Sequence, residues 1–240
     1  MTLYTELRDA ILAERPIVMA TVISGAGQVG AKLLVYANGS TLGSLGEQLP
    51  IKLIITEMLA MLAHGENGVR SYTSPAGDIE LFIESFPPPP TMFIVGAVHI
   101  AIALVTFAKT LGYRTVVVDA RAAFATAERF AHADELIIAW PDEALAGRLN
   151  SSSAVVLLTH DPKLDDPAIL AALASPASYI GALGSPQTHA KRLERLRQAA
   201  ISEEQLARLH APVGLKIGAR TPEEIAVSII AEVVATKRRK

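Results

Sequence analysis

The sequence predicts an α/β protein in two parts: a C-terminal domain built on a parallel sheet with helices on both faces, preceded by a small α+β domain. A run of four prolines, 87–90, interrupts the 240-residue chain, and such a run forms a stiff spacer without backbone donors for a sheet. After it, short apolar runs rich in β-branched residues alternate with helical stretches, which is typical of a parallel sheet. We therefore expect domains over 1–86 and 91–240 joined by a linker at 87–90.

In the first part, the apolar residues between positions 2 and 14 recur at helical spacing and predict a helix. Asn38-Gly39 favours a tight hairpin turn, and Gly65 ends a predicted buried helix. In chain order, the other expected elements are strands at 17–23 and 31–36, the buried helix at 50–65 and a strand at 79–86.

In the second part, the predicted strands are five short apolar runs, at 92–95, 115–119, 135–140, 154–159 and 177–183. The last helix has a clear start. Thr221 is the expected N-cap, Pro222 the first helical residue, and Glu224 completes a capping box.

Composition excludes several classes of protein. The 22 Lys+Arg and 24 Asp+Glu give a formal charge of -2, which excludes a polybasic nucleic-acid binder. With 50% hydrophobic and 19% charged residues, the chain has ample material for a core and does not resemble a disordered protein. It contains no cysteine, so disulfides, thiolate nucleophiles and cysteine-based metal centres are excluded.

A mean hydropathy of +0.34 raises the question of a membrane span. The best candidate, 92–108, is short for a span and contains Gly96 and His99, so a strand, a turn and a buried helix explain it better. The first residues show no basic segment followed by an apolar stretch, and we expect a cytoplasmic protein that binds neither membrane nor nucleic acid.

The most informative motif connects the first strand after the prolines to a helix. The Rossmann fingerprint G-x-G-x-x-G/A belongs in this context, and Gly96 and Ala101 occupy its first and third positions. Val98 occupies the second, where glycine normally lets the backbone approach a pyrophosphate, so its isopropyl group should crowd that approach. The helix N-terminus would still attract anions. His99 beside it is either a ligand contact or a packed core histidine.

An acid follows the second strand of this part. Asp119 suits a carboxylate that hydrogen-bonds a ribose 2′-OH, which would favour NAD over NADP. Arg121 lies close and blurs that choice. The alternative is a Rossmann-like fold that binds no dinucleotide, with Asp119 capping the next turn.

The C-terminal part resembles the xanthine dehydrogenase accessory protein family, XdhC/CoxI, over roughly residues 91–235. The motifs that carry the resemblance are GAVHIA at 96–101, VDAR at 118–121, LTHD at 158–161, YIGALGS at 179–185, LHAPVGL at 209–215 and IGARTPEEIA at 217–226. The first part is similar to the family's N-terminal domain through ATV at 20–22, GAK at 30–32 and GSLG at 43–46.

The resemblance implies a chaperone that binds the finished molybdenum cofactor and passes it to the apoenzyme of a molybdenum hydroxylase of the xanthine-dehydrogenase or CO-dehydrogenase kind. Such proteins are accessory proteins more than enzymes. This chain departs from the family pattern in two places. Residues 47–49 read Glu-Gln-Leu where the family has Cys-Val-Glu, and Val98 stands where typical members have glycine.

Two more turns follow predicted strands, and open α/β sheets bind ligands at the carboxyl ends of their strands. His160 and Asp161 follow the run at 154–159. Asp161 with Asp165 offers two carboxylates to a divalent cation, which are too few to define a metal site. The alternative is capping by Asp165 or Asp166 of a helix that starts near Pro167.

The second turn is rich in glycine. Gly181, Gly184, Ser185 and Thr188 can cradle a phosphate, and a simple turn with Ser185 as N-cap fits equally well. The basic residues of the next helix, 191, 192, 195 and 197, are expected to form a solvated face; a pterin phosphate or an acidic partner is the alternative. Arg220, in the loop before the last helix, either reaches an anionic ligand or serves a structural turn.

The leading hypothesis is a non-catalytic carrier whose C-terminal domain holds the anionic portion of the molybdenum cofactor. The expected contacts are Gly96, Val98, His99, Asp119, Arg121, His160, Asp161, Gly181, Gly184, Ser185, Thr188 and Arg220. Two alternatives stay open: an NAD(P)-binding oxidoreductase, which Val98 disfavours, and an assembly module that contacts the target enzyme without binding cofactor. A homodimer would be common for such a fold.

Overall fold

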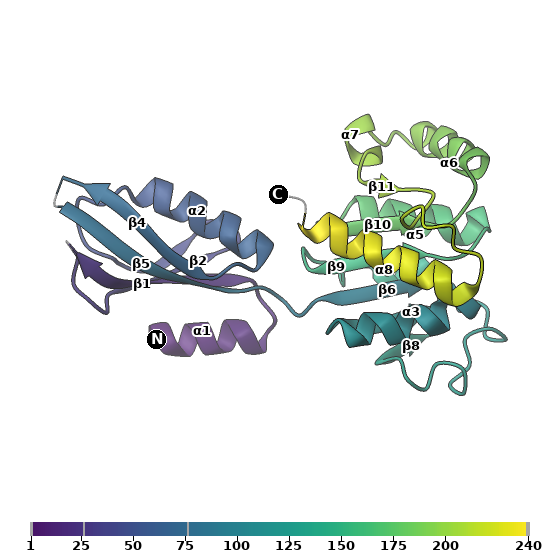
Figure 1. The fold of residues 1–240 in the computed structure, drawn as a ribbon, viewed down its shortest axis with the longest axis horizontal. Coiled ribbons are helices and arrows are strands. Elements are labelled where there is room, and N and C mark those ends of the chain that lie inside the picture. Colours follow the sequence, from purple (N-terminus) through teal and green to yellow (C-terminus); the bar gives the residue numbers. More distant parts are fainter. Residues whose placement is uncertain (1, 26, 76, 239–240) are drawn as a thin grey trace. The chain divides into compact units, whose positions relative to one another are not determined.

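A computed structural model describes residues 2–25, 27–75 and 77–238 of the chain. It divides into two compact units between Pro88 and Pro89, inside the run of prolines (Figure 1). Each unit has its own buried hydrophobic clusters.

The first unit is an antiparallel sheet with two helices, as the α+β prediction requires. Its strands lie in the order β3-β2-β1-β5-β4. Neighbouring antiparallel strands pair β2 with β3, on either side of Asn38-Gly39, and β4 with β5. The sequence pattern predicts the turn at Asn38-Gly39 but not the strands β3 and β4 themselves. In chain order, the elements are α1 (Leu3–Leu12), β1 (Ile17–Gly25), β2 (Lys32–Tyr36), β3 (Thr41–Gly43), α2 (Ile51–His64), β4 (Gly68–Ser74) and β5 (Gly77–Phe86).

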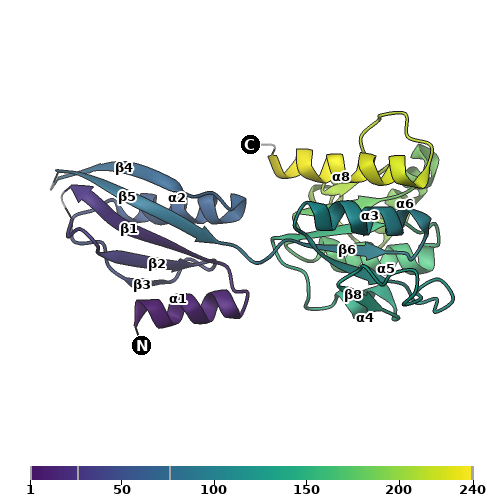
Figure 2. The same ribbon diagram turned by 60° about the horizontal axis from the view of Figure 1, so that its bottom comes forward.

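Alternation along β1 explains why this sheet carries a helix on each face (Figures 1 and 2). Ile17 packs in a cluster with Ala10 of α1, whereas Val18 and Ala20 belong to the cluster around α2. Successive side chains of a strand point to opposite faces, so one apolar run serves both helices. Helix α2 ends where predicted, with Gly65 in the left-handed conformation at φ +64°.

The second unit is a six-stranded sheet in which every described strand pair is parallel. The strand order β8-β7-β6-β9-β10-β11 is that of the Rossmann fold, and the predicted fold class is confirmed. In chain order, the elements are β6 (Thr91–Val95), α3 (His99–Thr110), β7 (Arg114–Val118), β8 (Glu135–Ile137), α4 (Pro141–Leu145), β9 (Ser153–Leu157), α5 (Pro162–Leu173), β10 (Tyr179–Ala182), α6 (Pro186–Gln198), α7 (Glu203–Leu206), β11 (Leu209–His210) and α8 (Pro222–Arg238).

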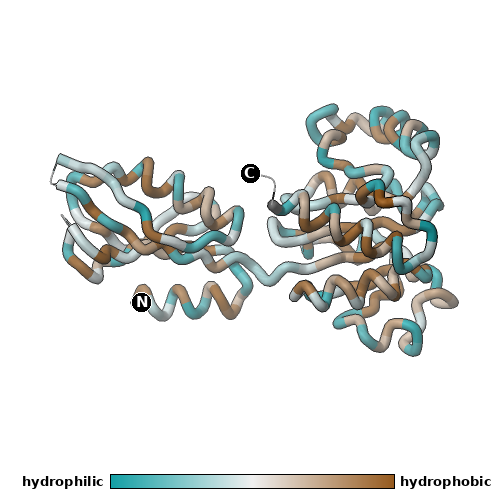
Figure 3. Tube along the Cα trace, in the orientation of Figure 1, coloured by the Kyte–Doolittle hydropathy of each residue, from teal (hydrophilic) through white to brown (hydrophobic). Residues whose placement is uncertain are grey.

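Helices cover both faces of this sheet. Met92 and Ile94 of β6 pack against α3 and α8, while Phe93 and Val95 face the cluster that includes α5 and α6. Because both faces are buried, the central strands are largely apolar, and the hydrophobic colouring continues from β6 into α3 (Figure 3). The segment 92–108 is thus a strand, a turn and a helix, and no described helix combines the length and hydrophobicity that crossing a membrane requires.

Two helix starts decide how the loops near the site run. Thr221 accepts a hydrogen bond from the Glu224 N–H at 3.2 Å, and the Glu224 carboxylate accepts from the Thr221 N–H at 3.1 Å, so the predicted capping box at α8 is confirmed. Helix α5, by contrast, begins at Pro162 with Asp161 as its N-cap. The predicted start near Pro167 was wrong. Pro162 is the first residue of the helix, and Pro167 lies inside it, five residues later.

Candidate functional site

The strand order places a crevice at the carboxyl ends of β6 and β9. The chain leaves β6 toward β7 on one side and leaves β9 toward β10 on the other, and ligands of open α/β sheets bind where the order reverses in this way. An open cavity of about 460 Å³ lies there. Its lining residues come from the loops after β6, β7 and β9: Val98, Arg121, Leu158, Thr159, His160, Asp161 and Pro162.

Gly96 closes the floor of this crevice. It has φ +110°, and a Cβ at this position would lie 2.6 Å from Cγ2 of Thr159. Its N–H donates to the carbonyl of Val118 at 2.8 Å, which ties the loop after β6 to the end of β7. Glycine is therefore required both by the backbone conformation and by the close approach of β9.

Val98 and His99 begin helix α3. Val98 is the N-cap, its side chain is half-buried, and it packs against the core cluster under α3. It offers no side-chain cap to the helix, and its carbonyl accepts the Ala101 N–H at 3.0 Å. The N–H groups of His99 and Ile100 therefore depend on water or a ligand for acceptors. His99 is exposed at the first helical position, which excludes the packed core histidine that the sequence left open.

Asp119 stabilises the loop between β6 and α3, which contains Gly96. Its side chain is fully buried, and it accepts the Ala97 N–H at 2.8 Å, the Arg121 N–H at 2.9 Å and two guanidinium donors of Arg121. Burial by itself would raise the pKa of Asp119, but the bonds from Arg121 and Ala97 outweigh it and lower the pKa. Both carboxylate oxygens are therefore held by protein donors, which is the turn-capping alternative that the sequence left open, and a contact with a ribose hydroxyl stays a prediction. Arg121, in turn, lines the crevice.

His160 and Asp161 stand on the opposite wall. His160 is exposed and lines both this crevice and a neighbouring cavity. Asp161 accepts the Lys163 N–H at 3.0 Å, so it caps α5. Asp165 is buried and occupied by protein donors. Across the described segments, no three His, Asp or Glu residues are grouped as a metal site would need.

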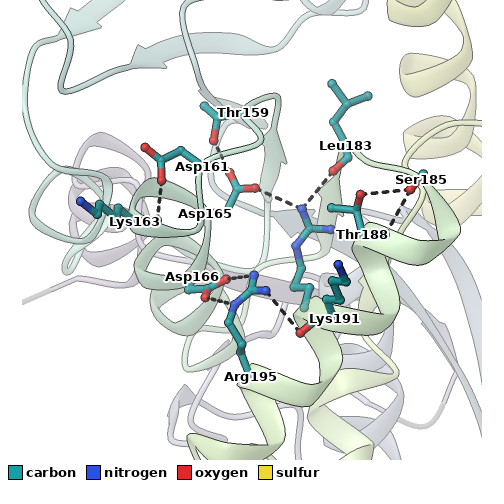
Figure 4. Close-up of polar contacts among 11 residues, drawn as sticks. Thr159, Asp161, Lys163, Asp165, Asp166, Leu183, Ser185, Thr188, Lys191 and Arg195 are labelled. Carbon is teal, nitrogen blue, oxygen red and sulfur yellow. Dashed lines mark hydrogen bonds and ion pairs between the residues drawn. The ribbon is translucent and has the colours of Figure 1, made fainter.

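A buried polar chain runs behind this wall. The Thr159 hydroxyl donates to the Asp165 carboxylate, and Nη2 of Arg192 donates to the same carboxylate at 3.1 Å (Figure 4). Burial raises the pKa of Asp165, and the bonds from Thr159 and Arg192 oppose that rise. Arg192 is only 1% exposed, so the predicted solvated face was wrong at this residue. It lies one helical turn before the buried Leu196, which is the sequence signal that places it inward.

The glycine-rich turn after β10 divides into two roles. Gly181 lies inside β10, within the strand predicted at 177–183, and a Cβ there would meet Cγ2 of Val213 at 2.5 Å. It is thus a packing glycine, and its contact with a phosphate stays a prediction. Gly184, with φ +148°, forms the turn itself. Ser185 caps α6 by accepting the Thr188 N–H at 3.1 Å, as the structural alternative predicts.

Arg220 lies away from these turns in the sequence and precedes α8. Its N–H donates to the Glu224 carboxylate at 2.7 Å, and its side chain is exposed. Helix α8 begins at the end of the unit toward which β6 runs (Figures 1 and 2). Arg220 is thus on the side of the carboxyl ends, and no described contact joins it to the crevice residues.

Relatives of known name match this chain along different lengths. The uncharacterized Escherichia coli protein YqeB is 30% identical over 251 residues, covering 99% of this chain and 46% of that protein. A Bacillus subtilis protein, named as a probable xanthine dehydrogenase subunit, is 36% identical over 160 residues, 66% of this chain and 46% of that one. The E. coli molybdenum cofactor insertion chaperone PaoD is 36% identical over 92 residues, 38% of this chain and 29% of its own. The chain spans less than half the length of these relatives.

A solved structure shares the fold. A Bacillus halodurans protein described as a xanthine dehydrogenase superposes with a TM-score of 0.57 at 24% identity, covering 98% of this chain and 96% of that one. Two family models match as well: the XdhC Rossmann domain over 92–233 and the XdhC and CoxI family model over 10–73. The first of these spans the whole crevice and more than half of the chain. The chain therefore belongs to the XdhC and CoxI family.

Proposed function

We propose that this protein is an accessory protein that binds the molybdenum cofactor and delivers it to the apoenzyme of a xanthine-dehydrogenase-type hydroxylase. The cofactor is the cargo, and its anionic portion would lie at the carboxyl ends of β6, β9 and β10. The name of the relative PaoD, a molybdenum cofactor insertion chaperone, supports this role. So does the name of the B. subtilis relative, which refers to xanthine dehydrogenase.

One observation carries the proposal from the structure. Arg121 and the N-terminus of α3, which has no side-chain cap, offer donors to an anion in the crevice, while the hydroxyl groups and carboxylates around it already hold the fold together. Thr159 donates to Asp165, Ser185 caps α6, and Asp119 holds the loop after β6. A site of this kind favours holding a charged ligand over activating a nucleophile, since activation requires a base within hydrogen-bond reach of the nucleophile. This supports a carrier.

The residues nearest the cofactor would bind and orient it. The N–H groups at the start of α3 and the Arg121 guanidinium are the donors on the β6 side. His160 and the first turns of α5 and α6 lie on the other side. The chain has no cysteine, so its contacts to the cofactor would be made by nitrogen and oxygen groups.

The test is reconstitution of a target enzyme. Apo xanthine dehydrogenase would be incubated with molybdenum cofactor, with and without this protein, and the recovered hydroxylase activity measured over time. We expect faster and more complete recovery with the wild-type protein. Arg121→Gln should reduce the gain, whereas Arg8→Gln, an exposed arginine of the first unit, should leave it intact. Recovery that is identical with and without the protein would contradict delivery.

A further inference from the structure

A second cavity, of about 260 Å³, lies between the N-terminal parts of α5 and α6. His160 and Pro162 line both this cavity and the crevice at β6 and β9, so the two hollows adjoin. Figure 4 shows the carbonyl of Leu183 and the side chain of Ser185 in the turn after β10, with Thr188 and Lys191 on α6 beside them.

Arg192 is the unusual feature of this cavity. Its Nη2 donates to Asp165 at 3.1 Å and to the carbonyl of Leu183 at 3.0 Å. Its Nε and Nη1 are buried and have no hydrogen-bond partner among the described residues. A guanidinium carries five N–H donors, and leaving a buried charged donor unpaired is costly. Two nitrogens of Arg192 in the wall of the cavity therefore have no acceptor among the described residues.

The charges around the cavity point to the kind of acceptor that is missing. Three cations line it against one carboxylate, that of Asp165. Arg195 forms an ion pair with Asp166 at 2.5 Å, so its positive charge is compensated. Asp166 does not compensate the positive charges of the neighbours of Arg195 on α6. Lys191 forms no ion pair with the residues that the structure describes. The surplus is positive. Lys191 and Arg192 lie in the middle of the 13-residue helix α6 and Arg195 lies in its last turn, so it is their side chains that favour an anion in the cavity.

Gly184 keeps space open beside the unpaired nitrogen. It adopts φ +148°, and a Cβ built there would lie 3.2 Å from Cγ2 of Thr188 and 3.8 Å from Nη1 of Arg192. A larger residue would fill the space between the turn and the guanidinium. Because Gly184 has no side chain, a small space stays open beside Arg192, whose Nε and Nη1 have no acceptor among the described residues.

We propose that this cavity binds a phosphate group, carried as a monoester by a ligand whose remainder extends into the adjoining crevice. Arg192 offers a planar guanidinium, which suits the oxygens of a phosphate, and Lys191 adds a charge on a flexible stem. In the first turn of α6, Pro186 has no N–H and Ser185 accepts that of Thr188, so Gln187 is the residue of this turn whose N–H can reach the phosphate. That the phosphate belongs to the molybdenum cofactor rests on the proposed function, whereas the phosphate site itself does not.

The probes are inorganic phosphate and phenyl phosphate, titrated calorimetrically into the purified full chain at low ionic strength. We expect one site per chain, with phenyl phosphate binding more tightly than inorganic phosphate. Lys191→Gln should weaken phosphate binding about threefold and Gly184→Ala about tenfold. Arg192→Lys keeps the charge and loses the fork, and should also weaken it about tenfold. Lys52→Gln, the same charge change in the first unit, should have no effect.

Circular dichroism of each variant separates lost binding from lost folding, and Lys191 is exposed, so its variant should fold. Equal phosphate affinity for the wild type, Lys191→Gln and Gly184→Ala would overturn the site. Phenyl phosphate binding no more tightly than inorganic phosphate would overturn the ester part. If phosphate binds as expected while the protein never carries pterin, the proposed function fails and this inference stands. If the protein carries pterin but Lys191→Gln, Gly184→Ala and Arg192→Lys all bind phosphate as tightly as the wild type, the inference alone fails.

Discussion

The backbone N–H of Ala97 donates to the carboxylate of Asp119 at 2.8 Å, which joins the loop after β6 to the end of β7. Arg121 holds the same carboxylate from the other side with a pair of guanidinium bonds at 2.9 and 2.8 Å. The floor and one wall of the crevice thus share a single buried charge, and the shape of the crevice depends on it.

Asp119→Asn should lower the free energy of unfolding by about 2–3 kcal/mol. The amide removes the charge opposite a partly buried Arg121 and cannot accept from all four donors. Urea denaturation monitored by circular dichroism measures the loss. Asp161→Asn is the matched control, because Asp161 is exposed and asparagine caps a helix as well as aspartate. Its effect should stay below about 0.5 kcal/mol, and equal losses in the two variants would argue against the special role of Asp119.

The same pair predicts a dependence on pH. The pKa of Asp119 is lowered in the folded protein, so its contribution is complete above the ordinary value of 3.8 and is lost as the pH falls through the lower, folded pKa. The stability gap between the wild type and Asp119→Asn should therefore be constant near neutrality and shrink only below pH 3.8. A gap that already closes between about pH 5 and 7 would contradict this assignment.

Gly96→Ala should destabilise the second unit by about 2–4 kcal/mol, because it combines a positive φ with a Cβ 2.6 Å from Thr159. Gly112→Ala isolates the first of these effects. Gly112 has φ +81° and open space around it, so its loss should be about 1 kcal/mol. Thermal unfolding of the two variants measures the difference. Similar losses would show that the close approach of β9 contributes nothing.

The buried pair of Asp165 and Arg192 should behave as a unit. Asp165→Leu and Arg192→Met should each cost about 3–5 kcal/mol, since each leaves an unpaired buried charge. The double variant should cost less than the sum by more than about 1 kcal/mol. A double-mutant cycle in urea provides the coupling energy, and strict additivity would mean that the 3.1 Å contact is energetically silent.

The second unit should fold by itself. Its clusters include only residues after the prolines, and the division at Pro88 and Pro89 interrupts neither sheet. A chain of residues 89–240 is expected to give a single cooperative urea transition with helical circular dichroism. A fragment without such a transition would show that the first unit is needed for its stability.

Much of the fold could be predicted because the decisive signals are local. The run at 115–119, for example, has three consecutive valines at 116–118, which suits a strand buried on both faces. Strand β4 was missed because Gly68–Ser74 is largely polar and exposed on one face. Strand β11 has only two residues, which is too short for any periodicity. Capping residues such as Thr221 were found because their hydrogen bonds are made within four positions.

The site was harder to predict because its contacts join distant residues. The sequence pointed to Asp119 as the acid at the end of a strand, but which donors it accepts depends on the fold of two loops. Arg192 was assigned to a solvated face because its neighbours are basic, yet the turn at Gly184 and the wall at Asp165 enclose it. Gly181 looked like part of a phosphate turn, and only the packing of Val213 shows its structural role.

The pterin content of the purified protein tests directly whether it carries the molybdenum cofactor. The full chain would be expressed anaerobically in a host that makes molybdenum cofactor, and the extract oxidised and assayed for the fluorescent pterin derivative. We expect stoichiometric pterin on the wild type, strongly reduced pterin on Gly184→Ala, and unchanged pterin on Gly112→Ala. A wild-type protein that folds normally and carries no pterin would contradict the carrier role, and binding of NADH by the same batch would favour a nucleotide-binding protein instead.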